Sequence, residues 1–284
     1  MATRRHERFA FDHGAQYFTV RDERFARVVR SWAHDGVVAP WAGRLCARAD
    51  DGVLTPLPAE PRWVGVPSMS ALCRHLAADL DLRLETAVSA LDGGPGAWRL
   101  RAAASGVEDP FDVVLVAAPA PRAAELLAPV PALAGRAAAA ELAPCQAVMV
   151  AFAGPVDPGF DGATIARSRL AWAACDSSKP GRAPGSCWVL HATPAWSAAH
   201  LDAPSDQVAG TLLAAFAAVV GRPLPPELHH ETHRWRNALA TRPVEEDCLW
   251  DGAAGVGACG DWCIGGRVEA AFLSGMALAS RVVD

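Results

Sequence analysis

The residues near the end of the chain form the pattern with the clearest chemical meaning. A short apolar stretch ends at Gly260 and Asp261, a glycine pair follows at Gly265–Gly266, and a helix rich in small residues is expected to start there. A carboxylate placed after a strand can accept hydrogen bonds from sugar hydroxyls, and the free N–H groups of a helix start favour an anionic or carbonyl group. Glu269, in the expected first turn, suits the positive helix end. The pattern predicts a binding place for a polyol phosphate joined to an electron-poor ring.

A second candidate lies near the start of the chain, in the run FAFDHGAQYFT over residues 9–19. Gly14 and Ala15 permit a close backbone approach to a flat ligand, because glycine has no Cβ atom and alanine a small side chain. Gln16 and Tyr17 offer polar and stacking contacts. Taken alone, this run is more often a turn than a site, and the pattern at the other end is more often a surface turn before a buried helix.

The two segments together resemble a known family. The C-terminal segment resembles the flavin-binding signature of the FAD-dependent amine oxidase superfamily, and residues 12–19 closely resemble the DHGAQYFT block of bacterial renalase-like proteins, a branch of that superfamily. Weaker matches extend over essentially the whole chain. They lie at residues 1–5, 67–72, 112–121, 178–182, 188–191, 196–197 and 233–235.

The resemblance implies an FAD cofactor and a mixed α/β fold. It also implies hydride transfer from an isomeric dihydronicotinamide dinucleotide, NAD(P)H, to the flavin, with reoxidation by O2 to give H2O2. The residues that it implies as FAD contacts are Thr3, Arg4, Gly14, Ala15, Gln16, Tyr17, Val88, Ala118, Pro119, Gly260, Asp261, Gly266, Arg267, Val268 and Glu269.

One expected segment is not found in the sequence. Members of the family begin with a strand, a G-x-G-x-x-G turn and a helix, which hold the FAD pyrophosphate at the helix start. The run Gly93–Gly96 contains proline and follows no strong strand, so it indicates a hairpin turn. Met1 falls where an internal methionine of the family would lie. We therefore expect an N-terminally truncated family member, explained either by a start codon assigned too late or by a real truncation.

The composition excludes several classes of protein. The net charge is −5 over 284 residues, and the single lysine is Lys179, so no basic run indicates nucleic acid or an anionic membrane. The longest apolar runs are too short to span a bilayer, and no signal peptide is recognised. The eight cysteines are dispersed without C-x-x-C pairs, which predicts no metal site and reduced thiols in the cytoplasm.

Hydrophobic periodicity predicts the elements. Helices are expected at 21–35, at 68–79 with Ser68 as N-cap and Leu72, Leu76 and Leu80 on one face, at 206–220, and mainly at 125–143. Strands are expected within 41–63, at 82–90 and 97–103, and at 111–118 as a strand buried on both faces. Further strands are expected at 148–152, 162–165, 170–174, 187–192 and 228–238.

These elements predict an α/β (α+β) protein of two interleaved lobes. The resemblance implies that residues 1–30, 61–143 and 240–284 form an incomplete, Rossmann-like FAD-binding domain. Residues 31–60 and 144–239 would form a substrate domain on a mostly antiparallel sheet. A ligand site between two such lobes is the usual arrangement.

Few residues suggest acid–base chemistry, and hydride transfer to a flavin needs little of it. His191 and Trp235 are the catalytic candidates; the alternative is a structural role, because a histidine at a strand end is more often structural and a tryptophan more often packs. Lys179 and Arg182 lie in a Pro/Gly loop that is either solvated or in contact with a substrate phosphate. The lysine that some amine oxidases use near the flavin has no obvious equivalent here.

Two alternatives to the renalase-like interpretation stay open. An amine oxidase or desaturase of the same fold would act on an amine or another small molecule. A non-catalytic fragment would bind no FAD, because the pyrophosphate would lack its anchor.

Overall fold

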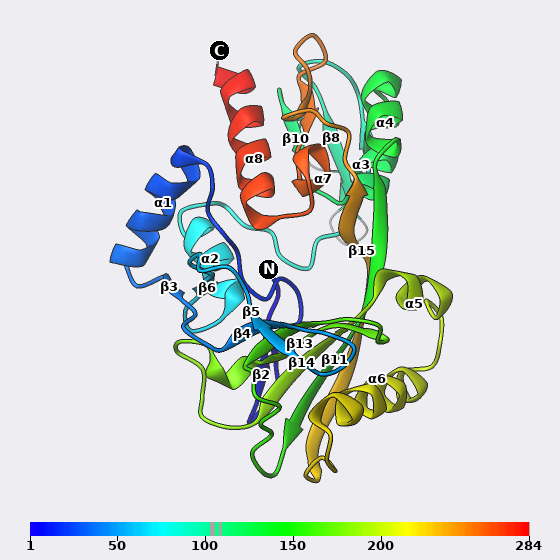
Figure 1. Cartoon of the computed structure of the whole chain (residues 1–284). Helices are drawn as coiled ribbons and strands as arrows, with labels where there is room; N and C mark the ends of the chain where they lie inside the picture. The colour runs from blue at the N-terminus through cyan, green and yellow to red at the C-terminus, as the bar shows by residue number, and fades with distance from the viewer. Residues whose placement is uncertain (103–105, 108–109, 284) are drawn as a thin grey trace. The chain divides into compact units, whose positions relative to one another are not determined.

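The computed structural model describes residues 1–102, 106–107 and 110–283 (Figure 1). The chain forms two compact units, and each is built from two stretches of sequence. Unit 1 comprises residues 1–78 and 143–238, and unit 2 comprises residues 79–142 and 239–284. The long strands β11 (Glu141–Phe152) and β15 (Glu227–Arg242) carry the chain across the boundaries of these units.

Unit 1 is built on a mixed sheet that contains seven strands among the described residues, in the order β15-β11-β14-β13-β12-β4-β5. The pairs β11–β14, β14–β13, β13–β12 and β4–β5 are antiparallel, and β12 pairs parallel with β4. The sequence predicted this mostly antiparallel sheet. Besides β11 and β15, the strands of this sheet are β4 (Leu45–Arg48), β5 (Leu54–Pro56), β12 (Gly162–Ile165), β13 (Leu170–Cys175) and β14 (Cys187–Ala192).

The central strands of this sheet are buried on both faces, whereas its edge strands β5 and β15 are largely exposed. In β11, Val148 and Val150 belong to a cluster with Trp188 and Phe216, whereas Met149 belongs to a second cluster on the alternate face. The period of two along a strand sends neighbouring side chains to opposite faces. Helix α6 (Ser205–Val220) covers the first face, as Figure 1 shows, and contributes the ring of Phe216.

The remaining elements of unit 1 form its N-terminal part, the turn between β13 and β14, and the short helix between β14 and α6. Helix α1 (Glu23–His34) buries Phe25, Val29 and Trp32, as its apolar spacing predicted. The other elements are β1 (Arg4–Arg5), β2 (Ala10–Phe11), β3 (Val38–Pro40), β6 (Trp63–Gly65), α2 (Met69–Leu76), the 3-10 turn Asp176–Ser178 and α5 (Pro194–Ala199).

Unit 2 contains two small sheets and four helices among the residues that the structure describes. In one sheet β10 (Val114–Val116) pairs parallel with β17 (Val256–Ala258), which pairs antiparallel with β16 (Leu249–Asp251). The other sheet has the order β7-β8-β9 and confirms the hairpin turn at residues 93–96. Its remaining elements are β7 (Val88–Asp92), β8 (Arg99–Ala102), β9 (Gly106–Val107), α3 (Ala120–Leu126), α4 (Pro131–Ala138), α7 (Asp261–Ile264) and α8 (Val268–Val283).

Three sequence predictions in unit 2 and at its border are wrong in part. The strand at 111–118 is not buried on both faces: β10 lies at the edge of its sheet, and Leu115 is 45% exposed. The strand expected at 82–90 begins only at Val88, and α2 ends at Leu76, which is exposed like Leu80. A run of apolar residues in the sequence does not show whether another helix or strand packs over their side chains. Ala103, the expected end of the next strand, lies outside the described residues.

The compact units divide the chain differently from the proposed domains at the N-terminus. Residues 1–30 and 61–78 belong to the unit of the seven-stranded sheet, whereas we assigned them to the FAD-binding domain. Near residues 143 and 239, the borders of the compact units lie within one residue of the borders of the assigned domains. Among the described residues, no helix is both long and apolar enough to pass through a bilayer.

Candidate functional site

The C-terminal motif folds as a strand, a short helix and a long helix in unit 2. Strand β17 ends at Ala258, Gly260 follows, and Asp261 opens the short helix α7, which the sequence did not predict. Gly265 and Gly266 then lead into α8. The first N–H groups of an α-helix have no partner within the helix, so the start of α8 can donate hydrogen bonds to a ligand.

The ends of two parallel strands lie together here. Cys259 N–H donates to Val116 O at 3.1 Å, and the indole N–H of Trp262 donates to Ala118 O at 3.0 Å. Because β10 and β17 are parallel, their carboxyl ends share one edge of the sheet. The predicted residues Ala118, Pro119, Gly260 and Asp261 are thereby brought to the same edge.

The glycines of the motif allow a close approach of backbone. A Cβ atom at Gly266 would lie 2.6 Å from Leu239 Cδ1 and 3.2 Å from the backbone nitrogen of Ala240. A Cβ atom at Gly260 would lie 2.4 Å from Trp262 Nε1. The backbone N–H of Gly260 donates to the hydroxyl of Ser274 on α8 at 3.1 Å. A side chain at either position would push the strand end and the helices apart.

Asp261 is the acidic group of this edge. Burial raises the pKa of its carboxyl above the usual value, while the N–H groups of Trp262 and of Asp261 itself oppose this effect. None of the arginine, lysine or histidine side chains in the described part of the chain pairs with it. A carboxylate in that setting can accept hydrogen bonds from a neutral donor such as a sugar hydroxyl.

Val88 and Glu269 complete the predicted set in unit 2. Val88 is the first residue of β7, and its carbonyl accepts a hydrogen bond of 2.6 Å from the guanidinium of Arg122 on α3. Glu269 is buried in the first turn of α8. With Arg267 and Val268 beside it, the motif presents a helix start, a buried carboxylate and two strand ends within one compact unit.

In unit 1, the carboxylate of Asp12 organises the N-terminal block. Its Oδ1 accepts hydrogen bonds from Thr3 Oγ1 at 2.6 Å and from the backbone N–H of Met69 at 2.9 Å. Arg182 donates to its Oδ2. Burial alone would raise the pKa of Asp12, but Lys179, Arg182 and the Thr3 hydroxyl outweigh burial, and the net direction is downward. Asp12 is therefore an ionised carboxylate that ties the N-terminal strand to the start of α2.

Lys179 connects this carboxylate to the loop after it. Its buried ammonium group lies 2.6 Å from Asp176 Oδ1 and donates to Gln16 Oε1 at 3.1 Å. The amide of Gln16 in turn donates to the carbonyls of Asp12 and Gly14. The loop that contains Gly14 and Ala15 is thus held by a buried network of two acids and two cations.

His13 adds a second set of contacts to the same loop. Its carbonyl oxygen accepts from Trp235 Nε1 at 3.0 Å and from His191 Nε2 at 3.0 Å. Because a carbonyl oxygen can only accept, the ring proton of neutral His191 lies on Nε2. Burial lowers the pKa of His191 to about 4. Burial, then His233 and Arg4, lowers the pKa of His13 to about 4.

The aromatic rings around His13 form one packed group. Its imidazole stacks on Trp235, with ring centroids 5.1 Å apart, and meets the edge of His233 at 4.7 Å. The guanidinium of Arg4 lies 3.2 Å from His233 Nδ1, and since arginine only donates, that nitrogen accepts. A Cβ atom at Gly14 would lie 3.7 Å from the Trp235 ring. The backbone of this loop therefore passes directly against an aromatic surface.

The structure groups the predicted residues by unit. Unit 1 brings together the predicted residues of the N-terminal block with His191, Trp235, Lys179 and Arg182, and unit 2 brings together those from Val88 onward. Lys179 and Arg182 lie in buried ion pairs and not in a solvated loop. Whether any of these residues contacts FAD or a substrate stays a prediction.

Sequence reasoning missed four participants: Asp12, His13, Asp176 and His233. Asp176 and Lys179 are three residues apart, which is the spacing of neighbouring side chains on a helical turn. This spacing is the one feature of the sequence that could have predicted their ion pair. The contacts of Asp12 with Lys179 and Arg182 join residues far apart in the sequence, and no local pattern predicts them. In the part of the chain that the structure describes, no three His, Cys, Asp or Glu side chains are placed to hold a metal ion.

Comparison with known proteins shows the fold. No family model matches the chain. A proposed protoporphyrinogen oxidase from Exiguobacterium sp. 255-15 superimposes with a TM-score of 0.61 at 20% identity, covering 80% of this chain and 53% of that one. A double mutant of putrescine oxidase, made in a redesign of its cofactor binding, gives 0.59 at 13% identity, covering 79% and 54%. The chain spans about half the length of these proteins. It shares the mixed α/β fold of these two oxidases.

Proposed function

We propose that this protein is an FAD-dependent oxidoreductase of the renalase-like type. Its substrate would be an isomeric dihydronicotinamide dinucleotide, and its electron acceptor O2. Bound FAD would supply the hydride acceptor: the dihydronicotinamide would leave as the oxidised nicotinamide, and O2 would take up the two electrons from the reduced flavin to form H2O2. The eight cysteines are free thiols, which supports a cytoplasmic location.

One observation carries this proposal: the half-buried Asp261 carboxylate lies where two parallel strands end together, at the start of α7 and shortly before the start of α8. The donor set fits the cofactor, because a carboxylate without a cationic side-chain partner can accept from ribityl hydroxyls. The α8 start offers N–H groups to the pyrimidine end of the ring system. The fold of the oxidases described above supports the same assignment.

The residues of unit 1 would orient and shield rather than transfer protons. His191 and Trp235 hold the carbonyl of His13, and Lys179 holds Gln16, so the backbone at Gly14 keeps one conformation. A fixed, glycine-lined backbone suits the face of a flat ligand. The lowered pKa values of His13 and His191, both about 4, keep these rings neutral near pH 7 and unsuited to act as acids.

The visible absorbance of the purified chain tests the proposal first. A flavin spectrum, either as purified or after addition of FAD, is the expected result. A colourless protein that takes up no FAD would support the alternative of a non-catalytic chain.

Replacement of Asp261 by Asn tests the carboxylate itself. We expect D261N to weaken FAD binding at least tenfold, because a hydrogen bond to a charged group contributes about 1.5–3 kcal/mol. Flavin fluorescence quenching in a titration measures the dissociation constant. The matched control is D247N, which removes the same charge from an exposed position of unit 2. Equal FAD dissociation constants for D261N and D247N would show that the carboxylate of Asp261 does not bind the cofactor.

Turnover assays separate the renalase-like activity from its closest alternative. We expect H2O2 release with isomeric dihydronicotinamides and none with primary amines. The opposite result would assign the chain to an amine oxidase or desaturase of the same fold.

A further inference from the structure

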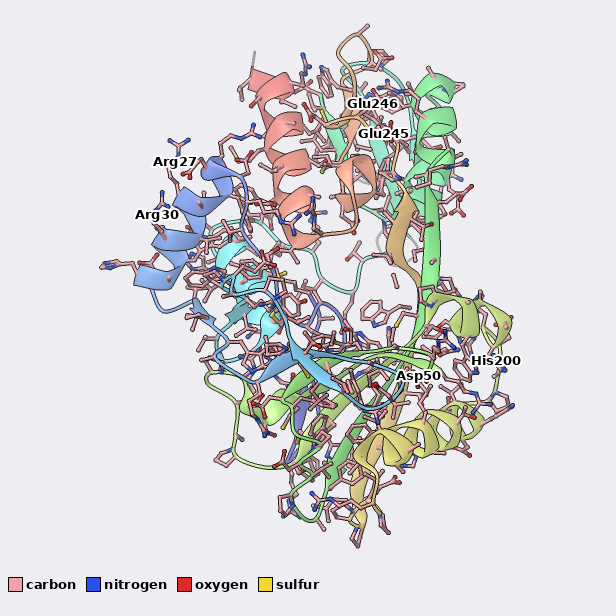
Figure 2. The ribbon with its side chains drawn as sticks, in the orientation of Figure 1. Arg27, Arg30, Asp50, His200, Glu245 and Glu246 are labelled. Atoms are coloured by element: carbon pink, nitrogen blue, oxygen red, sulfur yellow. The ribbon has the colours of Figure 1, made fainter. Side chains whose placement is uncertain are left out.

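A surface pocket of unit 1 uses none of the residues assigned above to FAD or its substrate. Its volume is about 400 Å³, within the usual range of small-molecule sites. It lies where α5 and α6 meet the turn between β12 and β13. The residues that line it are Arg169, Trp196, His200, Gly210, Thr211 and Ala214. Figure 2 labels His200 at the turn between the two helices.

Buried polar contacts hold the frame of this pocket in place. The carbonyl of Arg169 accepts from Thr193 N–H at 2.8 Å, and the Thr193 hydroxyl caps α5 by accepting from Trp196 N–H at 3.2 Å. The buried amide of Gln146 donates to the carbonyl of His200 at 2.9 Å. The turn, the helix start and the helix end are therefore joined before any ligand binds.

The ring of His200 is fixed in one orientation. It stacks on Trp196 with centroids 4.2 Å apart and an interplanar angle of 13°, and its Nδ1 lies 2.8 Å from the carbonyl of Trp196. Since that carbonyl can only accept, Nδ1 carries a proton. In the neutral ring Nε2 is then an acceptor, and no described residue bonds to it. The pocket thus offers an acceptor for a ligand hydroxyl.

Arg169 supplies a positive charge that has no partner in the described part of the chain. The acidic residue after α5, Asp202, pairs instead with Arg234 and Arg236, each at 3.1 Å. A guanidinium group presents several N–H donors in a plane and matches the oxygens of a phosphate. The hydroxyl of Thr211, on the adjoining face of α6, adds a donor that can turn toward the same anion.

Gly210 keeps the pocket open from the side of α6. A Cβ atom there would meet no atom within 4 Å, so packing does not demand a glycine at this position. Glycine within a helix costs about 0.5–1 kcal/mol relative to alanine. The residue that is least favourable for the helix therefore stands where a side chain would project into the pocket.

We propose that this pocket binds a small phosphate ester that carries free hydroxyl groups, such as a phosphorylated sugar. The phosphate binds to Arg169 and Thr211, a hydroxyl donates to His200 Nε2, and the C–H face of the sugar packs on the indole of Trp196. The proposal does not rest on the binding of FAD and adds a ligand to unit 1.

Calorimetric titration of the intact chain with three probes tests the proposal: ribose 5-phosphate, inorganic phosphate and ribose. We expect saturable 1:1 binding of ribose 5-phosphate with a dissociation constant below about 1 mM, at least tenfold weaker binding of phosphate, and none of ribose. Phosphate that binds as well as the ester would overturn the sugar part of the proposal. Absence of binding by ribose 5-phosphate would overturn all of it.

Two variants place the binding in this pocket. R169Q removes the charge, and G210L fills the space with a good helix former, so G210L should unfold at the same temperature as the parent or higher. Both should weaken ribose 5-phosphate binding at least tenfold. The matched control is R167Q, which removes the same charge from an exposed residue of the same turn that does not line the pocket. If R167Q weakened binding as much as R169Q, the phosphate would be held by surface charge alone and the site would be wrong.

Discussion

His13 and His191 show how single buried side chains set the properties of the N-terminal block. Both rings are neutral because burial lowers their pKa values from 6.5 to about 4. The unfolded chain takes up these protons as the pH falls below about 6.5, whereas the folded protein resists protonation until about pH 4. The free energy of unfolding must therefore fall between pH 6.5 and pH 4.

The variant H191Q tests this explanation. A glutamine amide can still donate to the carbonyl of His13 but does not titrate. We expect the loss of stability between about pH 7.5 and about pH 5 to shrink by on the order of 1–2 kcal/mol in the variant. Urea unfolding at the two pH values measures it. H75Q, at an exposed position of α2, should leave the dependence unchanged; a parallel change there would point to a different titrating group.

Asp12 shows a second effect at this scale. Ser68 stands at the N-cap position of α2 as the sequence predicted, but its side chain makes no capping hydrogen bond. The carboxylate of Asp12 accepts from Met69 N–H instead, and the Thr3 hydroxyl accepts from Ser70 N–H at 3.2 Å. The helix start is thus satisfied by residues far away in the sequence, which couples the N-terminal block to α2.

Strand β10 is the element whose environment differs most from its sequence pattern. It pairs with β17 on one side, and the described residues offer no strand on the other. Leu115 is 45% exposed, and Val113, directly before the strand, is 37% exposed. Parallel strands are normally covered on both faces, and an unpaired apolar edge readily pairs with another chain.

We expect the edge of β10 to make the protein self-associate, and L115K to suppress this association. A lysine on an edge strand disfavours further strand pairing. Sedimentation velocity over a rising concentration series would show less oligomer for L115K than for the parent chain. L76K is the control, since Leu76 is similarly exposed at 51% but lies at the end of a helix. Equal suppression by both variants would assign the association to general apolar exposure.

At the scale of the whole molecule, the chain is organised as two compact units with separate cores. The core of unit 1 contains Trp188 and Phe216, and that of unit 2 contains Leu133 and Trp262. Each unit draws on two separate stretches of sequence, so neither can fold from a continuous segment. Strands β11 and β15 carry the chain between them.

Separate cores predict separate responses to core mutations. W188A should lower the free energy of unfolding of unit 1 by about 3–5 kcal/mol, because it leaves a large cavity. Hydrogen exchange should then increase in peptides from residues 1–78 and 143–238 and change little in unit 2. The reciprocal variant L133A should have the opposite distribution. Equal increases throughout the chain for either variant would mean that the two units unfold as one.

The sequence by itself determined the periodic elements and the two motifs. The strands Gly162–Ile165 and Cys187–Ala192 have the predicted bounds, and helices α1 and α6 differ from prediction by two residues or fewer at each end. These predictions succeed because side-chain alternation and helical spacing are local properties. The strand–glycine–helix order around Asp261 is local too, and only the short helix α7 within it was missed.

Only the tertiary structure decided which side chains meet and which stay uncovered. The network of Asp12, Gln16, Asp176 and Lys179 joins residues more than a hundred positions apart, and the pocket at Arg169 and His200 forms where three elements converge. Strand β10 has the apolar residue types of a buried strand, yet it lies at an exposed edge. Burial and long-range pairing depend on which elements pack together, and one chain's local pattern does not contain that information.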